Sequence, residues 1–213
     1  MTDRLNKIFN AIPKTKTFAD VGCDHGYIAK EMLDSGKCEV AIISDVSAKC
    51  LKKAETLLND YVLENKAIPI VSDGFKQLPK VDTALIAGMG GMEIISILEG
   101  AKSLPETLIL QPMNNCQEVR TLLLHKGYKF ILDEMFYSLG KFYDLIVAQK
   151  GQDNLTLLEL EFGRDNLKNK GKDFLRFIEK QIKTLQSVLE NGNLNEENKA
   201  KIEKKIERLR SVC

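Results

Sequence analysis

The chain has 213 residues, of which 44% are hydrophobic, and its formal net charge is +1. A chain of this length and composition can bury a sizeable core, which excludes a disordered protein. Its apolar runs fall short of the roughly 18 residues that a membrane-spanning helix requires. Charged residues near the start are unlike a secretory signal peptide. We therefore expect a cytoplasmic protein without a membrane segment.

The five cysteines are Cys23, Cys38, Cys50, Cys116 and Cys213. They are odd in number, widely spaced and never form a CxxC pair, so the sequence predicts neither a disulfide framework nor a zinc site. We expect reduced thiols, most of them packed in the interior.

β-rich and helical segments alternate from residue 17 onward. The predicted elements are a strand over 17–22, a helix over 25–36, a strand over 38–45, a helix over 47–62 with Ser47 as its N-cap, strands over 67–73 and 81–88, a helix over 91–100, a strand over 107–112 and a helix over 116–127. Runs such as TALIA and LILQ lack polar alternation, which is typical of parallel strands covered by helices on both faces.

Residues 128–151 depart from this alternation of strands and helices. They contain two long β-rich runs separated by residues 138–141, which predicts a hairpin that adds an antiparallel strand to the sheet. Five βα steps followed by such a pair predict an α/β fold with a doubly wound, mostly parallel, seven-stranded sheet of the Rossmann-like type. We expect this domain to span residues 1–152.

Residues 153–213 are predicted to form a helical, coiled-coil-like extension. Apolar residues recur at helical spacing from Phe174 to Leu189, and the spacing resumes from Ile202 to Leu209 after a break at 191–193. This pattern predicts an antiparallel hairpin of two helices with one apolar seam, which Phe174 and Phe177 are expected to face.

The extension is also the basic part of the chain. Residues 164–213 contain 13 basic and 8 acidic side chains, whereas residues 1–150 contain 18 basic and 19 acidic ones. This asymmetry is typical of a nucleic-acid contact, and equally of a solvated helical surface.

Functional residues are expected where the parallel strands end, because ligands of open parallel sheets bind beyond the carboxyl ends of the strands. The first strand is followed by GCDHGY, whose glycines allow close approach to the backbone and whose following helix offers free N–H groups. Asp45 ends the second strand and suits the two hydroxyls of a ribose. Asp73 and Gly74 follow the third strand, where an acid can reach an adenine amino group or simply form a turn. Together these residues indicate a nucleoside ligand.

The first loop also indicates which nucleoside cofactor binds. Gly22 and Gly26 lie four residues apart with Asp24 and His25 between them, unlike the GxGxxG of a dinucleotide site. A carboxylate here would repel a pyrophosphate, whereas Asp20 and Asp24 suit a cofactor with an amino-acid end and a sulfonium. We therefore expect S-adenosylmethionine, with S-adenosylhomocysteine as its product. No metal is expected, because one histidine among scattered carboxylates lacks ligand spacing.

The segments ADVGCDHGYIA, SDVS, SDGF, LIAGMGG, LILQP and KFYDLIVAQ follow one another between Ala19 and Gln149. In them the chain resembles the class I S-adenosylmethionine methyltransferases and, more closely, the bacterial tRNA adenine-N1-methyltransferases that act on adenine 22 in the D-arm. That family also has a C-terminal helical extension. The chain departs from the family pattern with Cys23, Gly26 and Ala29 in place of serine, alanine and proline, and with LQPMNN in place of LQPN.

The resemblance implies that the first loop surrounds the methionine end of the cofactor, with Asp45 at the ribose and Asp73 at the adenine. Gly88 to Gly91 are implied to form the floor near the reacting methyl group. The predicted cofactor-binding residues are Asp20, Gly22, Cys23, Asp24, His25, Gly26, Asp45, Val46, Asp73, Gly74, Gly88, Met89 and Gly90.

The resemblance also implies methyl transfer to N1 of a tRNA adenine. N1 carries an in-plane lone pair and needs no general base, so the enzyme must flip the base out, exclude water and orient it. Tyr27 is the predicted stacking residue, and Asp24 and Asn114 are the candidates for contacting the N6 amine. His25 lacks an evident acid partner and is expected to brace the loop.

tRNA is the expected partner, and basic residues of the extension are expected to contact its backbone. They are Lys168, Lys170, Lys172, Arg176, Lys180, Lys183, Lys201, Lys204, Lys205, Arg208 and Arg210. Two alternatives stay open: a methyltransferase that acts on a small molecule or a protein, for which the extension would be dispensable, and a non-catalytic module that only senses the cofactor. We expect a monomer or a weak dimer.

Overall fold

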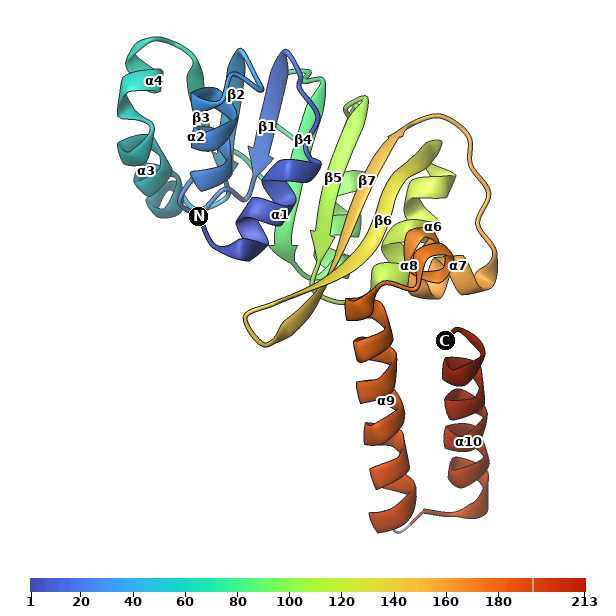
Figure 1. The fold of residues 1–213 in the computed structure, drawn as a ribbon. Helices are drawn as coiled ribbons and strands as arrows, with labels where there is room; N and C mark the ends of the chain where they lie inside the picture. Colours follow the sequence, from blue (N-terminus) through green and yellow to red (C-terminus); the bar gives the residue numbers. More distant parts are fainter. Residues whose placement is uncertain (193) are drawn as a thin grey trace.

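A seven-stranded sheet in the order β3-β2-β1-β4-β5-β7-β6 lies at the centre of the computed structural model, which describes residues 1–192 and 194–213. Strands β1 to β5 are parallel, and β7 pairs antiparallel with β5 and β6. The predicted fold class is therefore confirmed (Figure 1). The strands are β1 (Thr17–Val21), β2 (Val40–Asp45), β3 (Ala67–Val71), β4 (Thr83–Met89), β5 (Thr107–Pro112), β6 (Tyr128–Ser138) and β7 (Lys141–Lys150).

Helices cover both faces of the sheet. Ile8, Met32 and Leu51 from the first three helices are buried on one face, and Ile94 and Val119 from the fifth and sixth on the other. Coverage on both faces explains why the parallel strands are apolar throughout. The helices are α1 (Asp3–Ala11), α2 (Tyr27–Asp34), α3 (Ala48–Leu57), α4 (Asn59–Leu63), α5 (Gly91–Glu99), α6 (Cys116–His125), α7 (Leu157–Phe162), α8 (Arg164–Asn169), α9 (Lys172–Asn191) and α10 (Glu196–Ser211).

Some helices differ from the expected elements. The helix predicted over 47–62 is divided at Leu58, whose φ of −103° and ψ of 19° leave helical geometry. Ser47 caps α3 as predicted, because its side chain accepts a hydrogen bond from the backbone N–H of Cys50. No bounds are predicted for α1, nor for α7 and α8 inside the predicted helical extension. The last two have only six residues each, too few to show a helical period.

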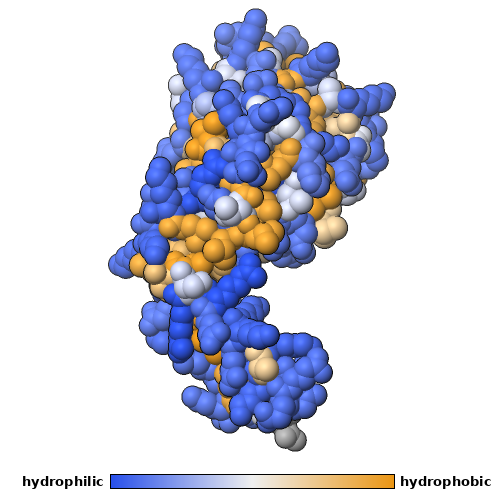
Figure 2. All heavy atoms as spheres, turned by 90° about the vertical axis from the view of Figure 1, so that its right-hand side faces the viewer, coloured by the Kyte–Doolittle hydropathy of each residue, from blue (hydrophilic) through white to orange (hydrophobic). Residues whose placement is uncertain are grey.

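The C-terminal helices α9 and α10 form the predicted antiparallel hairpin, which extends away from the rest of the molecule (Figure 1). Phe174, Ile178 and Leu209 are buried in a small core at its base. Phe177 is half-buried against this core, as predicted, and its ring also packs edge-on against Phe142 of β7 with the centroids 5.4 Å apart. Figure 2 shows apolar side chains gathered where the hairpin meets the rest of the molecule, whereas the hairpin itself is mostly hydrophilic.

Strand β6 lies at the edge of the sheet, where one row of backbone N–H groups has no neighbouring strand. Side chains of the segment after β7 accept hydrogen bonds from these groups. The donor and acceptor residues are Phe130 and Asp153, Asp133 and Asp165, Met135 and Asn166, and Tyr137 and Asp173, with N···O distances of 2.8–2.9 Å. The edge is thus covered by side chains, which fix the path of the chain from β7 to α9.

A buried arginine attaches the same segment to the sheet. Arg120 Nε donates to both carboxylate oxygens of Asp133, at 2.9 and 3.0 Å, and Nη2 donates to Asp144 at 2.6 Å. Its Nη1 donates to the carbonyls of Leu160 and Glu161 in α7, at 3.2 and 3.4 Å. Because the guanidinium is fully buried, the cost of burying its positive charge is offset only by these carboxylates and carbonyls.

Replacing Asp133 by alanine leaves Arg120 buried with one carboxylate partner. We expect the free energy of unfolding to fall by about 3–5 kcal/mol. The control Asp165→Ala removes a half-buried acceptor that water can replace, and should cost about 1 kcal/mol. Urea unfolding followed by circular dichroism measures both variants. Equal losses would show that the Arg120 network contributes nothing special to this attachment.

Candidate active site

The strand order places the carboxyl ends of β1, β2, β3 and β4 next to one another. Backbone hydrogen bonds join the loops that follow them. The N–H groups of Gly22 and Cys23 donate to the carbonyl of Ser44, at 2.8 and 3.0 Å, and the N–H of Ser72 donates to the carbonyl of Asp45 at 3.1 Å. The loops that carry the predicted site residues therefore form one continuous rim.

The loop after β1 is coiled by three residues in the left-handed region. Gly22, Asp24 and Gly26 have φ angles of 73°, 45° and 72°, and the N–H of Gly26 donates to the carbonyl of Cys23 at 2.8 Å. This conformation is strained for Asp24, which has a side chain. Helix α2 starts directly at Tyr27, so the loop delivers its ligand-facing residues at a helix N-terminus.

Asp20 lies at the end of β1 with only 6% of its surface exposed. Burial raises the pKa of its carboxyl to about 7; a hydrogen bond to the backbone of Ala29 in α2 works in the opposite direction, and the charge of Asp45 raises the pKa further. Asp45 is half-buried and accepts a hydrogen bond from the N–H of Ser47 at 2.8 Å. A cation bound beside Asp20 would relieve the cost of ionising it.

Asp24 has two cationic or polar neighbours. Its Oδ2 lies 2.7 Å from His25 Nδ1, and its Oδ1 lies 3.2 Å from Lys53 Nζ in α3. Burial raises the pKa of Asp24, but the hydrogen bonds and the charges of Lys53 and His25 together lower it below its usual value. The expectation that His25 lacks an acid partner is therefore wrong: its partner is the neighbouring residue, oriented by the left-handed backbone.

The ring of His25 also stacks on Tyr27, with the centroids 5.5 Å apart and the planes 6° from parallel. About half of the surface of Tyr27 is exposed. Asp24, His25 and Tyr27 thus form one ordered group at the mouth of the loop, with a free aromatic surface.

Strand β4 ends in the glycines expected to form the floor of the site. Met89 packs so closely on Gly22 that a Cβ at Gly22 would lie 2.0 Å from the Met89 methyl group. The N–H of Gly91, at the start of α5, donates to Asn114 Oδ1 at 2.9 Å. Asn114 is therefore occupied in joining the loop after β5 to the loop after β4.

A cavity of about 430 Å³ opens between the first loop, the end of β4 and helix α1. Its lining brings together eight predicted site residues: Asp20, Gly22, Cys23, Asp24, His25, Tyr27, Gly88 and Met89. The remaining predicted residues lie outside this lining, in the loops around it; they are Gly26, Asp45, Val46, Asp73, Gly74, Gly90 and Asn114.

Two of the residues outside the lining are exposed. Asp73 is exposed and pairs with Lys76, with Oδ2 and Nζ 2.6 Å apart. Val46 directly follows β2, and 73% of its surface is exposed.

Arg4 and Leu5 of α1 also line the cavity, and sequence reasoning missed them. The amphipathic pattern of the first ten residues is compatible with a helix, but no local pattern shows that this helix packs back onto the ends of β4 and β5.

In the part of the chain that the structure describes, no three His, Cys, Asp or Glu side chains are placed to hold a metal ion. Among the same residues, no helix is long and apolar enough to cross a membrane.

Known proteins resemble this chain over almost its entire length. The tRNA (adenine(22)-N(1))-methyltransferase of Bacillus subtilis is 27% identical over 223 residues, covering 98% of this chain and 94% of the relative. The crystal structure of Streptococcus pneumoniae Sp1610 in complex with S-adenosyl-L-methionine is similar with a TM-score of 0.89 and 27% identity, covering 100% of this chain and 99% of that one.

A further similar structure is that of M. capricolum TrmK in complex with S-adenosyl-homocysteine, with a TM-score of 0.88 and 25% identity over 99% of this chain and 96% of that one. The family model that describes tRNA (adenine(22)-N(1))-methyltransferases, TrmK, matches residues 18–211. The chain, with its acid- and glycine-rich cavity at the strand ends, belongs to this family of S-adenosylmethionine-dependent tRNA methyltransferases.

Proposed function

We propose that the chain, as a monomer or weak dimer in the cytoplasm, transfers a methyl group from S-adenosylmethionine to N1 of adenine 22 in the D-arm of tRNA. The observation that carries this proposal is the single cavity in which the acidic first loop and the glycines after β4 meet. Membership of the family supports the reaction and the substrate class.

The donor set of this cavity fits the cofactor. When bound, S-adenosylmethionine supplies an electrophilic methyl group on a sulfonium. Asp20 and Asp24 offer negative charge to the sulfonium and ammonium groups, and the same charges oppose a pyrophosphate. Asp45 would bind the ribose hydroxyls and Asp73 the adenine amine, while the exposed Val46 would pack on the adenine face.

The chain's own contribution to the reaction is positioning. The N1 lone pair attacks without a base, so the site must exclude water and hold the flipped adenine in line with the methyl group. Such orientation can lower the activation barrier by up to roughly 7–11 kcal/mol. Tyr27, braced by His25, would stack on the base. Asp24 would accept a hydrogen bond from the N6 amine. Asn114 Oδ1 already accepts from Gly91, so its remaining lone pair or its NH2 group would make the second contact.

The proposed reaction is tested by incubating the protein with labelled S-adenosylmethionine and unmodified tRNA, followed by nucleoside analysis. We expect the label in N1-methyladenosine only, and none when adenine 22 is replaced by uridine. A label in N6-methyladenosine or in a guanosine would contradict the assignment to N1 of adenine. Methylation of bulk protein or small metabolites in place of tRNA would favour the alternative substrate class.

The raised pKa of Asp20 predicts a pH-dependent affinity. The folded protein without ligand binds more protons than the unfolded chain between about pH 4 and pH 7, so this group's contribution to stability falls as the pH rises through that window. A bound cationic cofactor favours the ionised form of Asp20, so that its binding releases the proton from this carboxyl. We therefore expect affinity for S-adenosylmethionine to rise between about pH 6 and pH 8, as measured by calorimetry.

Two controls separate Asp20 from other titrating groups. The Asp20→Asn variant cannot ionise and should bind with little pH dependence. S-adenosylhomocysteine lacks the sulfonium, so its affinity for the unmodified protein should change less with pH. An equal slope in the native protein and in Asp20→Asn would show that another group titrates.

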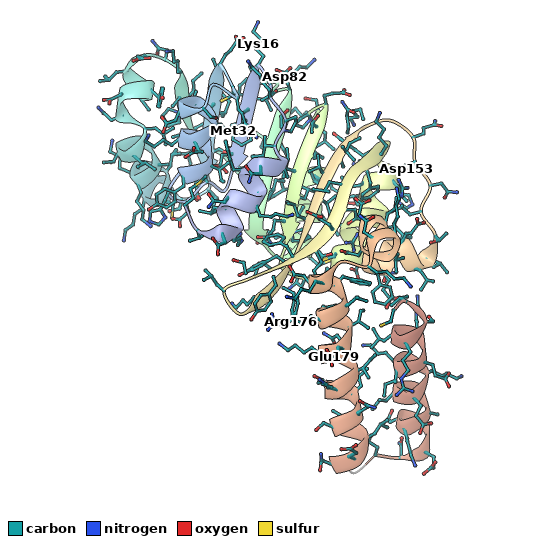
Figure 3. The ribbon with its side chains drawn as sticks, viewed as in Figure 1. Lys16, Met32, Asp82, Asp153, Arg176 and Glu179 are labelled. Atoms are coloured by element: carbon teal, nitrogen blue, oxygen red, sulfur yellow. The ribbon has the colours of Figure 1, made fainter. Side chains whose placement is uncertain are left out.

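We also propose that residues 1–152 form the methyltransferase domain and that the extension, residues 153–213, contacts the tRNA backbone. Arg176 lies beside the tip of the β6–β7 hairpin, with its guanidinium 4.1 Å from the Tyr137 ring centroid (Figure 3). Lys180, one turn further, lies 5.9 Å from the Phe142 ring. Both are exposed cations in α9, beside the β6–β7 hairpin.

The triple variant Lys172→Gln, Arg176→Gln, Lys180→Gln tests this contact. Removing three phosphate contacts should weaken tRNA binding and reduce the slope of log affinity against log salt by about 2–3, while cofactor binding is kept. The matched control replaces Lys80, Lys102 and Lys126, which lie at the opposite end of the sheet, and should retain the native slope. Unchanged salt dependence in the first variant would remove the extension from the proposed interface.

A further inference from the structure

Arg4 is held at the cavity by α1. The helix is anchored by Ile8, which is fully buried against the sheet. Arg4 Nε donates to Oε1 of Gln111, itself fully buried at the end of β5, at 2.7 Å. The guanidinium carbon lies 5.3 Å from the centroid of the Tyr143 ring in β7. One edge of the guanidinium is thus fixed by the protein.

The other edge of Arg4 faces the cavity. A Cβ placed on Gly88 would lie 2.9 Å from Arg4 Nη2, so this nitrogen lies directly beside the backbone at the end of β4. Arg4 and Gly88 both line the cavity, together with Asp20 and Gly22. The guanidinium therefore reaches the same space as the acidic first loop.

The charge of Arg4 lacks a counter-ion within the described residues: its hydrogen bond goes to a neutral amide, and burial lowers its pKa without a carboxylate to restore it. A buried or half-buried cation is costly unless it is paired. A guanidinium with one fixed edge and one free edge is suited to bind a carboxylate through two parallel N–H groups. The cavity therefore offers a prepared site for an anionic group.

We propose that Arg4 binds the α-carboxylate of the methionine part of S-adenosylmethionine. This assignment rests on the proposed function, because it requires that the cofactor binds in this cavity. The ammonium and sulfonium would then lie beside Asp20 and Asp24, and the carboxylate would lie at Arg4. A phosphate of the tRNA is the other anion available. The carboxylate is favoured because Arg4 is half-buried and lines the same cavity as Asp20 and Gly22, whereas the exposed cations of α9 are accessible to a phosphate backbone.

The test compares two ligands that differ only in the carboxylate. S-adenosylhomocysteine and its decarboxylated form, S-adenosyl-3-thiopropylamine, are titrated by calorimetry into the native protein and into Arg4→Gln. We expect Arg4→Gln to weaken S-adenosylhomocysteine binding about 10- to 100-fold, as for loss of a charged hydrogen-bond pair. Its affinity for the decarboxylated ligand should stay within about twofold of the native value.

An equal loss for both ligands, or no loss for S-adenosylhomocysteine, overturns the proposal. Native affinity of Arg4→Gln for S-adenosylhomocysteine combined with weakened tRNA binding would assign Arg4 to a phosphate instead. If the native protein fails to bind S-adenosylhomocysteine, the proposed function fails rather than the role of Arg4.

Two further variants keep the test decisive if Arg4→Gln folds poorly. Gln111→Glu is isosteric and places a carboxylate against Arg4 Nε, so it should weaken S-adenosylhomocysteine and spare the decarboxylated ligand in the same way. Lys7→Gln removes a cation from the same helix that pairs with Glu134 at 2.6 Å, and should leave both affinities unchanged.

Discussion

The burial of one carboxyl group sets the chemistry of the site. Asp20 is enclosed between the end of β1 and the first turn of α2, with Asp45 close enough to raise its pKa further. The fold could have placed an apolar residue there, as it does at the neighbouring Ala19 and Val21. In the protein without ligand, the raised pKa of Asp20 means that the ionised form of its carboxyl is disfavoured. A positively charged ligand beside Asp20 would offset this cost, which agrees with the proposed binding of a cationic cofactor.

The geometry around Asp20 follows from the parallel topology. Because β1, β2, β3 and β4 are adjacent and run in the same direction, their carboxyl ends lie at one edge of the sheet, and backbone hydrogen bonds join the ends of β1, β2 and β3. The left-handed residues of the first loop then turn Asp24 and His25 toward the cavity. The floor is closed by Met89 against Gly22, a contact that requires the missing Cβ of this glycine. The left-handed residues of the first loop and the close contact at Gly22 thus shape the walls of the cavity at this edge of the sheet.

Much of this arrangement could be predicted from the sequence, because it depends on local periodicity and on residues that directly follow strands. The acids at positions 20, 45 and 73, and the Ser47 cap, belong to this group. The division of the helix at Leu58 and the packing of Phe177 on Phe142 could not be predicted, because tertiary contacts decide them. Arg4 was missed for the same reason: it lies 107 residues from Gln111 in sequence, and only the folded sheet brings them together.

The separation of charge along the chain suits the proposed reaction. Methyl transfer moves one positive charge from sulfur to the purine over a few ångströms, so the carboxylates proposed to stabilise the cofactor would remain close to the cationic product. The acidic cavity therefore need not change its protonation during the reaction. It would, however, repel the RNA backbone, and the basic residues of the extension lie on a separate element. The side-chain acceptors along β6 and the buried Arg120 fix the start of that element to the sheet. In the proposed function, the polyanion and the single flipped base would therefore be bound at different places on the molecule.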